Sequence, residues 1–308
     1  MNAEDRITAW FASQTPLDPR RFPIGIGDDM AQIRLDGATV LVTTDMLLDG
    51  THFDRSRHSL EQIGFKAMNV NLSDCAAMAT VPLCAVGATA LPEDMGAEDL
   101  KLLHIGVTRA GAAFECPVVG GDITAWRGAG RLAICLTVLS RPVEGVEPVR
   151  RDGARVGDAV CVTGALGGSG RGRHLSFVPR VHEAITLARR VRLHAMMDIS
   201  DGLSSDLHRI CTASRCGAVL EARRIPLSDE ARRCGDPLAA ALHEGEDFEL
   251  LFTVAEAEAG PLEAEGVGGL PVTRIGTITA EPGVRIVMAD GAVHALPPGG
   301  YDHLETRP

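Results

Sequence analysis

The sequence predicts a two-domain protein of the α/β (α+β) class. Through the first half of the chain, β-branched apolar runs alternate with segments of helical periodicity. A stretch rich in Gly, Pro and Arg at residues 141–158 interrupts this alternation, and a new apolar run follows it. The length of 308 residues also suits two domains of about 150 residues each. We therefore expect an N-terminal domain over residues 1–145 and a C-terminal α/β domain over residues 146–308.

The individual elements follow from the residue pattern. Helical periodicity and helix-forming composition predict helices over 3–13, 60–79 and 93–114. β-branched and apolar runs predict strands over 38–44, 82–92, 117–124 and 130–142. The first of these strands is expected to end at Asp45. In the C-terminal half, the same patterns predict a strand over 159–166 and a helix over 179–191, with further structured segments over 194–215, 242–254 and 271–280.

The charge balance excludes two classes of partner. The chain has 30 Lys+Arg against 41 Asp+Glu, a net charge of −11. It therefore lacks the basic face that nucleic acid or an anionic membrane surface requires. The two lysines, Lys66 and Lys101, both lie outside any G-x-x-x-x-G-K-[ST] motif, so a P-loop is excluded. Lys66 is expected on a helix surface, with no functional role.

The cysteines and the N-terminus indicate a cytoplasmic protein. The eight cysteines are scattered, none forms C-x-x-C, and most lie in apolar runs, which is typical of reduced, buried thiols. The first residues lack the basic and apolar regions of a signal peptide. The longest uncharged run, residues 75–91, contains Pro and Gly and is short for a membrane span.

Aspartates recur at the ends of apolar runs. An Asp beside Gly, Ser or Thr closes such a run within residues 25–31, 43–53, 70–78, 118–124 and 196–207. Any one of them could simply cap a helix or fill a turn. Five in one acidic chain favour a site carried at the rim of the scaffold. Carboxylate, hydroxyl and carbonyl oxygens are ligands for hard cations, and Mg²⁺ is usual where phosphates complete the shell.

Seven motifs occur in the order found in one enzyme family. They are GIGDD (25–29), TTDMLLDGTHF (43–53), KAMNVNLSDCAAMA (66–79), GGDIT (120–124), MDISDGLSSDL (197–207), GEDFELLF (245–252) and GYDH (300–303). With these motifs the sequence resembles the thiamine-monophosphate kinases, which belong to the superfamily of aminoimidazole ribonucleotide synthetase. The resemblance extends from about residue 4 to residue 304.

The resemblance implies an ATP-dependent kinase that phosphorylates thiamine monophosphate, a phosphotransferase whose acceptor is itself a phosphate group, using several Mg²⁺ ions. The implied metal ligands are Asp29, Thr43, Thr44, Asp45, Asp74, Asp122, Asp198 and Asp201, of which Asp45 and Asp122 are the implied catalytic residues. The implied ATP contacts are Gly121, Asp122, Arg151 and Ser200, and the implied thiamine monophosphate contacts are His52, Glu246 and Tyr301. The family fold further implies a homodimer in which the N-terminal mixed sheets of two chains pair into a barrel.

The acidic composition agrees with that chemistry. A carboxylate about 4 Å from a phosphate oxygen is opposed by roughly 4 kcal/mol at an effective dielectric near 20. Two polyanionic substrates can therefore enter such a site only with cations between them and the aspartates. Because the acceptor is a phosphate oxygen that is ionised at neutral pH, positioning and charge neutralisation suffice and no general base is required.

Several of these residues also have an ordinary structural explanation. Tyr301 could be a packing or surface aromatic, although stacking on the cationic thiazolium is favoured by its motif. His52 could be a core or surface histidine, and Glu246 could be one more helix charge. Arg151 has two basic neighbours in VRRDGAR (149–155), any of which could face solvent.

One segment departs from the family. The run TGALGGSGRG (163–172) fits neither G-x-G-x-x-G nor G-x-S-x-G, so a flexible turn is expected there instead of a phosphate loop. The segment 168–180 is shorter than the family's helical stretch at this place. Further along the chain, Glu244 stands where the family often has Gly, and Phe248 where it often has Tyr. These changes bear on the C-terminal domain more than on the implied metal site.

Three alternative functions remain at this point. One is another ATP-using enzyme of the superfamily, of the purine-intermediate or selenophosphate synthetase type. A selenophosphate synthetase is expected to carry a reactive Cys near the N-terminus, whereas the first cysteine here is Cys75. A hydrogenase-maturation relative is expected to end in a cysteine, whereas this sequence ends in HLETRP. The last is a cation- or nucleotide-binding protein without turnover, which missing acidic residues would favour; every acidic position that can be matched is filled.

Overall fold

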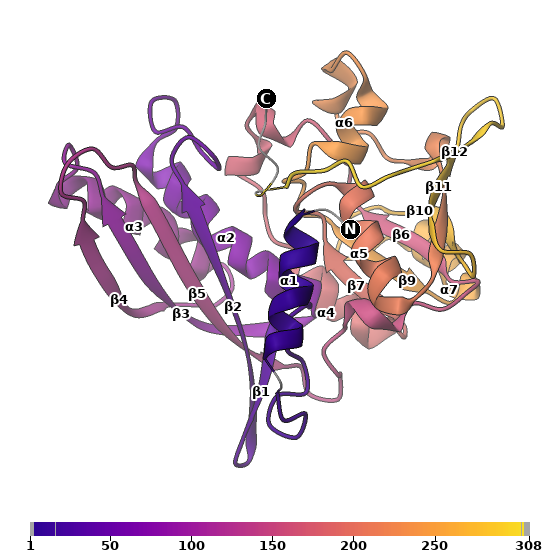
Figure 1. The fold of residues 1–308 in the computed structure, drawn as a ribbon, viewed down its shortest axis with the longest axis horizontal. Helices are drawn as coiled ribbons and strands as arrows, with labels where there is room; N and C mark the ends of the chain where they lie inside the picture. The colour runs from indigo at the N-terminus through magenta and orange to yellow at the C-terminus, as the bar shows by residue number, and fades with distance from the viewer. Residues whose placement is uncertain (1–2, 16, 303, 305–308) are drawn as a thin grey trace.

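The computed structural model describes residues 3–15, 17–302 and 304, which form two lobes (Figure 1). The N-terminal lobe is built on a mixed sheet in the order β1-β2-β5-β3-β4, in which β3 and β4 are parallel and the other neighbours antiparallel. Its strands are β1 (Ala31–Leu35), β2 (Ala38–Leu48), β3 (Thr80–Leu91), β4 (Val118–Ala125) and β5 (Ala133–Pro142).

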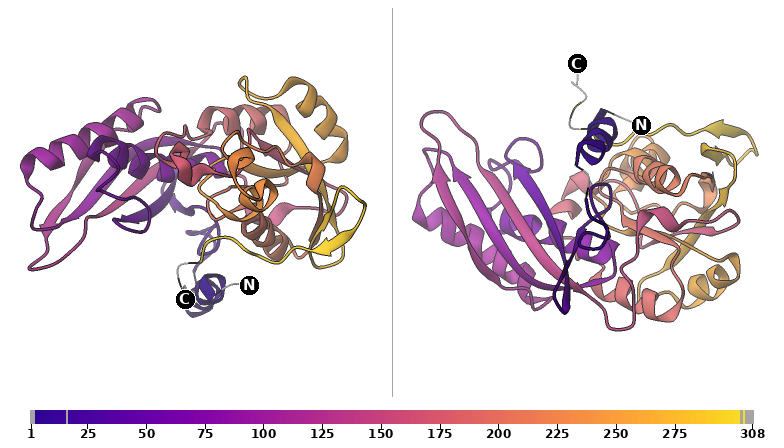
Figure 2. Two further views of the ribbon diagram at one scale, coloured as in Figure 1. Left: turned by 90° about the horizontal axis from the view of Figure 1, so that it is seen from above. Right: turned by 60° about the horizontal axis from the view of Figure 1, so that its bottom comes forward.

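Helices α2 (Leu60–Ala77) and α3 (Ala97–Ala112) cover one face of this sheet (Figure 2). A capping box begins α2, since the Ser59 side chain accepts the Gln62 N–H and the Gln62 side chain accepts the Ser59 N–H. Gly64 and Gly106 allow close packing, because a Cβ at either position would lie within about 2 Å of a backbone oxygen of the other helix. The capping box and the two glycines thus fix α2 in place.

The opposite face of the N-terminal sheet is bare and apolar. Along β2, Leu41 and Leu47 are buried toward the helices, whereas Met46 and Leu48 point the other way and are 58% and 39% exposed. Val86 of β3 adds to this face. Exposed apolar side chains gathered on one face of a sheet favour an interaction site.

The C-terminal lobe has a seven-stranded sheet between two layers of helices. Its order is β12-β11-β8-β10-β6-β9-β7, with β8 and β11 parallel and the other neighbours antiparallel. The strands are β6 (Ala159–Thr163), β7 (Ala195–Asp198), β8 (Gly217–Glu221), β9 (Leu250–Val254), β10 (Val272–Thr279), β11 (Gly283–Val287) and β12 (Val293–Ala295). The helices are α4 (Val181–Arg190) and α7 (Glu256–Glu265) in one core cluster, and α5 (Leu203–Ser214) and α6 (Pro237–His243) in the other.

The first helix lies against the C-terminal lobe. In α1 (Ala3–Gln14), the Asp5 carboxylate pairs with Arg209 of α5 at 3.2 Å. Figures 1 and 2 show α1 beside that lobe and away from the N-terminal strands, apart from β1 and the chain around it. None of the helices in the described part of the chain combines the length and hydropathy of a membrane span.

The two-domain α/β (α+β) class is confirmed, and the predicted helices and strands lie within a few residues of the observed ones. The prediction that the first strand ends at Asp45 is wrong, because β2 continues to Leu48 and remains paired with β5. The segment 194–215 divides into β7 and α5. Strands β1, β8, β11 and β12 were not predicted; each is five residues or shorter and gives little periodic signal.

Candidate active site

A cavity of about 490 Å³ lies between the two lobes and is lined from both. The N-terminal lobe contributes the loop before β1, the middle of β2 and one side of α2, and the C-terminal lobe contributes loops at its near edge. Of the residues expected in the site, the cavity brings together Asp29, Thr43, Thr44, Asp45, His52, Asp74, Arg151, Asp198, Ser200, Asp201, Glu246 and Tyr301.

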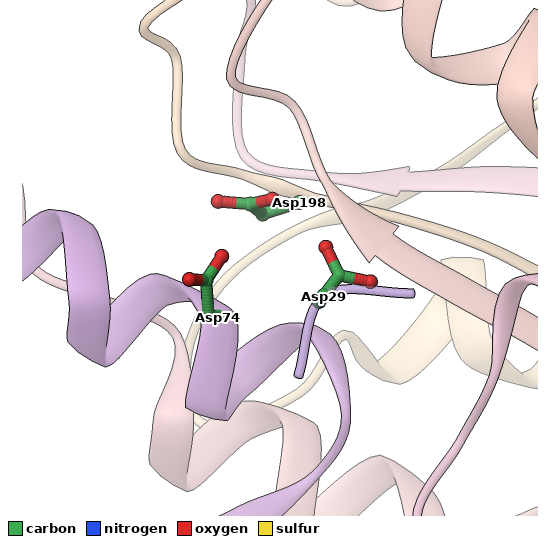
Figure 3. Close-up of side chains that lie close together, drawn as sticks. All are labelled: Asp29, Asp74 and Asp198. Atoms are coloured by element: carbon green, nitrogen blue, oxygen red, sulfur yellow. The ribbon is translucent and has the colours of Figure 1, made fainter. Parts of the chain in front are cut away.

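Three aspartates converge at the centre of this cavity. Asp29 precedes β1, Asp74 lies in α2 and Asp198 ends β7, and one carboxylate oxygen of each lies within 4.8 Å of the others. Figure 3 shows the three side chains directed toward a shared space. The Thr43 hydroxyl donates to Asp74, and the Ser73 hydroxyl donates to Asp198 across the boundary between the lobes.

The electrostatics of these carboxylates favour a cation. Burial raises the pKa of Asp74 well above its usual value, and the neighbouring charges of Asp45 and Asp198 raise it further. Burial, together with the Asp29 charge, raises the pKa of Asp198 to about 7. For Asp45, burial raises the pKa to about 6, although a hydrogen bond with Asp74 acts in the opposite direction. Clustered buried carboxylates keep their charge readily only when a cation lies among them.

The TTD run does not present three ligands to one point. Because successive side chains in a strand alternate between faces, Thr43 and Asp45 lie on the helix side of β2 and Thr44 lies on the bare side. The Thr44 hydroxyl donates to the Leu136 carbonyl at 3.1 Å and accepts from Thr137 at 2.9 Å. Thr44 still borders the cavity, but its hydroxyl is directed to β5.

Two arginines hold aspartates of the cavity in defined positions. Arg151 donates to both oxygens of Asp29, at 2.9 and 2.7 Å, and is the one residue of its basic run that lines the cavity. Arg209 binds the Asp201 carboxylate at 2.5 Å and that of buried Asp206 at 2.7 Å. The Arg151 contact joins the N-terminal loop to the C-terminal lobe.

Helix α2 lines the cavity with one stripe of residues. Lys66, Val70 and Asp74 are spaced four residues apart and all face the cavity. Eight residues of α-helix span about 12 Å, so Lys66 marks the end opposite Asp74. The expectation that Lys66 is a surface residue is wrong: its side chain is 1% exposed, and its ammonium binds the Glu246 carboxylate. The charge of Lys66 by itself does not predict that its side chain is buried. Its i, i+4, i+8 spacing with Val70 and Asp74 does place it on the same face of the helix as Asp74.

The segment after β7 organises the remaining C-terminal residues. The Ser200 carbonyl accepts the Glu246 N–H at 2.7 Å, and the Asp201 carbonyl accepts the Tyr301 N–H at 3.0 Å. Both Glu246 and Tyr301 border the cavity. Glu246 is in no helix, which removes helix charge as its explanation. His303, the last residue of the GYDH motif, lies outside the described residues.

His52 follows β2 in a tight turn. Its Nδ1 accepts the Leu48 N–H at 3.0 Å, so the neutral ring carries its proton on Nε2. Its carbonyl accepts the Lys66 ammonium at 2.6 Å. The ring orientation is therefore set by the backbone of the strand that also carries Asp45.

Gly121 and Asp122 lie away from this cavity. They sit on edge strand β4, where seven of the eight residues are exposed, and border a second hollow of about 590 Å³. Strand β4 is three steps from β2, so Asp122 lies about 14 Å from Asp45 at normal strand spacing. Within one chain, these two expected catalytic residues do not meet.

The glycine cluster binds carboxylates of the protein itself. The Gly167 N–H donates to Asp247, and the Gly168 N–H donates to Glu244, at 2.9 Å in each case. The segment after them forms two short 3-10 turns, Ser169–Arg171 and Arg173–Leu175. This is the turn expected in place of a phosphate loop.

Comparison with known proteins agrees with the geometry. The family described as AIR synthase related protein, N-terminal domain, matches residues 27–141, and its C-terminal domain matches residues 155–289. The thiamine-monophosphate kinase of Rhodopirellula baltica is 40% identical and covers 98% of both chains. A solved structure described as AaThiL complexed with AMPPCP and TMP superposes with a TM-score of 0.81 at 31% identity, covering 97% of this chain and 95% of that one.

A more distant similarity concerns the fold alone. A solved structure of the hydrogenase maturation protein HypE has a TM-score of 0.72 at 20% identity, over 94% of this chain and 97% of that one. By contrast, the kinase relative covers nearly every residue at twice that identity. The chain therefore belongs to the thiamine-monophosphate kinase family of the AIR synthase related proteins.

Proposed function

We propose that the protein transfers the γ-phosphoryl group of ATP to thiamine monophosphate, giving thiamine diphosphate and ADP. The observation that carries the proposal is the convergence of Asp29, Asp74 and Asp198 in a cavity lined by both lobes. Support comes from the family, whose curated member in Rhodopirellula baltica is a thiamine-monophosphate kinase, and from a related structure described with AMPPCP and TMP.

The donor atoms fit Mg²⁺. They are carboxylate and hydroxyl oxygens, and burial raises the pKa of Asp74 and Asp198, as expected for a cluster built around a cation. The residues that would hold the ions are Asp29, Thr43, Asp45, Asp74, Asp198 and Asp201, together with Asp122 of a second chain, whereas the Thr44 hydroxyl is engaged with β5. When bound, Mg²⁺ neutralises the phosphate charge and lets both substrates lie among the aspartates.

The chain's own residues then position the reactants. We assign the nucleotide to Arg151, Ser200, Gly121 and Asp122, and the acceptor to His52, Glu246 and Tyr301. Of the acceptor residues, His52 and Glu246 lie at the Lys66 end of α2, and the cluster of Asp29, Asp74 and Asp198 lies at the Asp74 end. This order sets the acceptor's phosphate toward the aspartates and its rings toward His52 and Glu246. Alignment of the two phosphates is the main catalytic contribution, because the acceptor oxygen is already ionised.

We also propose that two chains pair through their N-terminal sheets. The bare face with Met46, Leu48 and Val86 supports this, since burying exposed apolar area drives association. Pairing also resolves the separation of Asp45 from Asp122: we infer that Asp122 of the partner subunit completes the cavity. The cytoplasm, which supplies ATP, is the compartment we propose for the reaction.

The direct test is turnover. Purified protein with ATP, Mg²⁺ and thiamine monophosphate should form thiamine diphosphate and ADP in equal amounts, followed by ³¹P NMR. Asp45→Asn and Asp122→Asn should each lower the rate by about 100-fold or more, because each removes charge that phosphoryl transfer depends on. No product from the wild-type protein, or undiminished product from both variants, contradicts the proposal.

A further inference from the structure

Lys66 is a buried cation at the acceptor end of the cavity. Of the two lysines in the chain, Lys101 is 67% exposed in its side chain, whereas Lys66 is 1% exposed. A buried ammonium is costly unless it is paired and hydrogen-bonded. The partners of Lys66 therefore indicate why the charge is held there.

Both partners are residues assigned to the acceptor. The Lys66 ammonium donates to the His52 carbonyl at 2.6 Å and to a carboxylate oxygen of Glu246. Burial lowers the pKa of Lys66, and the Glu246 carboxylate opposes that shift. Lys66 and His52 belong to the N-terminal lobe and Glu246 to the C-terminal lobe, so a single ammonium joins two substrate-facing segments across the boundary.

The backbone around Glu246 leaves its side chain dependent on that contact. Glu246 has φ +54° and Phe248 has φ +50°, in the left-handed region that residues other than glycine rarely adopt. This conformation aims Asp247 and Glu249 into the lobe, where they bind Arg173 and Arg180. Glu246 is directed to the cavity instead, with 31% of its side chain exposed. Among the described residues, the Lys66 ammonium is the hydrogen-bond partner of its carboxylate.

We propose that Lys66 is a positioning residue for thiamine monophosphate, holding the Glu246 carboxylate and the His52 turn in the geometry that receives the organic part of the acceptor. This inference rests on the proposed function. It assigns Lys66 to acceptor binding and not to the carboxylate cluster, whose member Asp74 lies about 12 Å away along α2.

Steady-state kinetics separate this role from a merely structural one. Lys66→Met should raise KM for thiamine monophosphate by about 10-fold or more while changing KM for ATP by less than about 2-fold. Lys66→Arg should recover most of the loss, because a guanidinium can still bind both partners. Arg285→Met, which removes one exposed positive charge from an ion pair on β11, is the matched control and should change neither KM.

A double mutant tests whether Lys66 acts through Glu246. Because Lys66 also holds the His52 turn, Lys66→Met combined with Glu246→Gln should raise KM for thiamine monophosphate by less than the product of the two single rises. Additive losses, or equal rises in both KM values, overturn the proposal. If wild-type protein forms no thiamine diphosphate, the proposed function fails, whereas normal wild-type turnover with an unchanged KM in Lys66→Met defeats only the Lys66 inference.

An NMR signal provides a readout without turnover and without relying on Lys66→Met to fold. In a Lys101→Arg protein labelled at the lysine ε-carbon, the single signal reports Lys66. Thiamine monophosphate alone should shift that signal, and the ATP analogue AMPPCP with Mg²⁺ should leave it in place. A signal that does not respond to saturating thiamine monophosphate contradicts the inference.

Discussion

The raised pKa values of single carboxylates in the cavity make the stability of the folded protein depend on pH. The pKa of Asp198 is raised by burial to about 7 and that of Asp45 to about 6, against an unfolded value near 3.8. A group whose pKa is raised on folding stabilises the protein at low pH and loses that contribution as the pH rises through the folded value. For these two aspartates the contribution is lost progressively from about pH 4 upward, up to about pH 6 for Asp45 and about pH 7 for Asp198.

The first prediction concerns magnesium and pH. In EDTA, the contribution of these groups to stability should fall as the pH rises from 5.5 to 8, because repulsion among their charges grows. Mg²⁺ binds the ionised form, so it should raise Tm by only about 1 °C at pH 5.5 and by about 5 °C or more at pH 8. Differential scanning calorimetry measures both values.

Asp198→Asn supplies the control for this experiment. It removes one repelling charge, so at pH 8 in EDTA it should be more stable than the wild type by about 1 kcal/mol, with a weaker response to Mg²⁺. A magnesium-induced rise in Tm that is equal at both pH values would show that these carboxylates do not titrate with the ion.

The buried side chains of the segment 245–249 hold its backbone in place. Asp247 accepts from Ser169 and Gly167, and Glu249 accepts from Arg180 through both oxygens at 2.9 and 2.5 Å. Phe248 stacks on Phe177 with ring centroids 4.0 Å apart. These contacts hold the left-handed backbone and so direct Glu246 into the cavity.

The second prediction tests the Arg180–Glu249 pair. Arg180→Met leaves the Glu249 carboxylate, 3% exposed, without its cation and should lower the free energy of unfolding by about 3–5 kcal/mol. Arg190→Met, at the other end of α4, breaks an exposed pair with Glu265 and should cost less than about 1 kcal/mol. Urea unfolding compares the two, and similar losses would mean that the buried pair does not anchor the segment.

At the scale of the whole molecule, we propose that the site depends on assembly. The two lobes bring twelve of the expected residues together, but Gly121 and Asp122 stay on the far edge of the sheet. If a second chain covers the bare apolar face of that sheet, it can bring its own Gly121 and Asp122 to the cavity that holds the other twelve residues. Activity and dimerisation are then inseparable.

The third prediction is complementation between inactive chains. If Asp122 acts in the partner's cavity, a dimer of one Asp45→Asn chain and one Asp122→Asn chain keeps one intact site. Refolding the two variants together in equal amounts should restore about one quarter of wild-type activity, because half the dimers are mixed and each has one working site. Activity is measured as thiamine diphosphate formed.

Two comparisons make the complementation decisive. Adding Val86→Asp to both chains should abolish the recovery, since it places a charge on the bare face, whereas Val293→Asp, on exposed β12, should not. Sedimentation velocity should show monomer for the first and dimer for the second. No recovery in mixed dimers places Asp122 in its own chain's site.

Much of the fold could be read from the sequence because its main elements are long and periodic. Helix α2 and strands β3 and β5 were predicted within a few residues. The short strands were missed because pairing with neighbours, more than local periodicity, defines them. The idea that the aspartates end strands holds for Asp198, while Asp74 lies inside a helix and Asp45 inside a strand.

The sequence by itself determined the chemistry: an acidic chain without a P-loop, rich in oxygen ligands, with the ordered motifs of one kinase family. Only the tertiary structure decided which residues meet. It joined Asp29 and Asp198, 169 positions apart, buried Lys66 against Glu246, and left Asp122 on an edge strand. The reason is physical, because composition and local pattern fix charge and periodicity, whereas burial and pairing arise from contacts between segments that are distant in the chain.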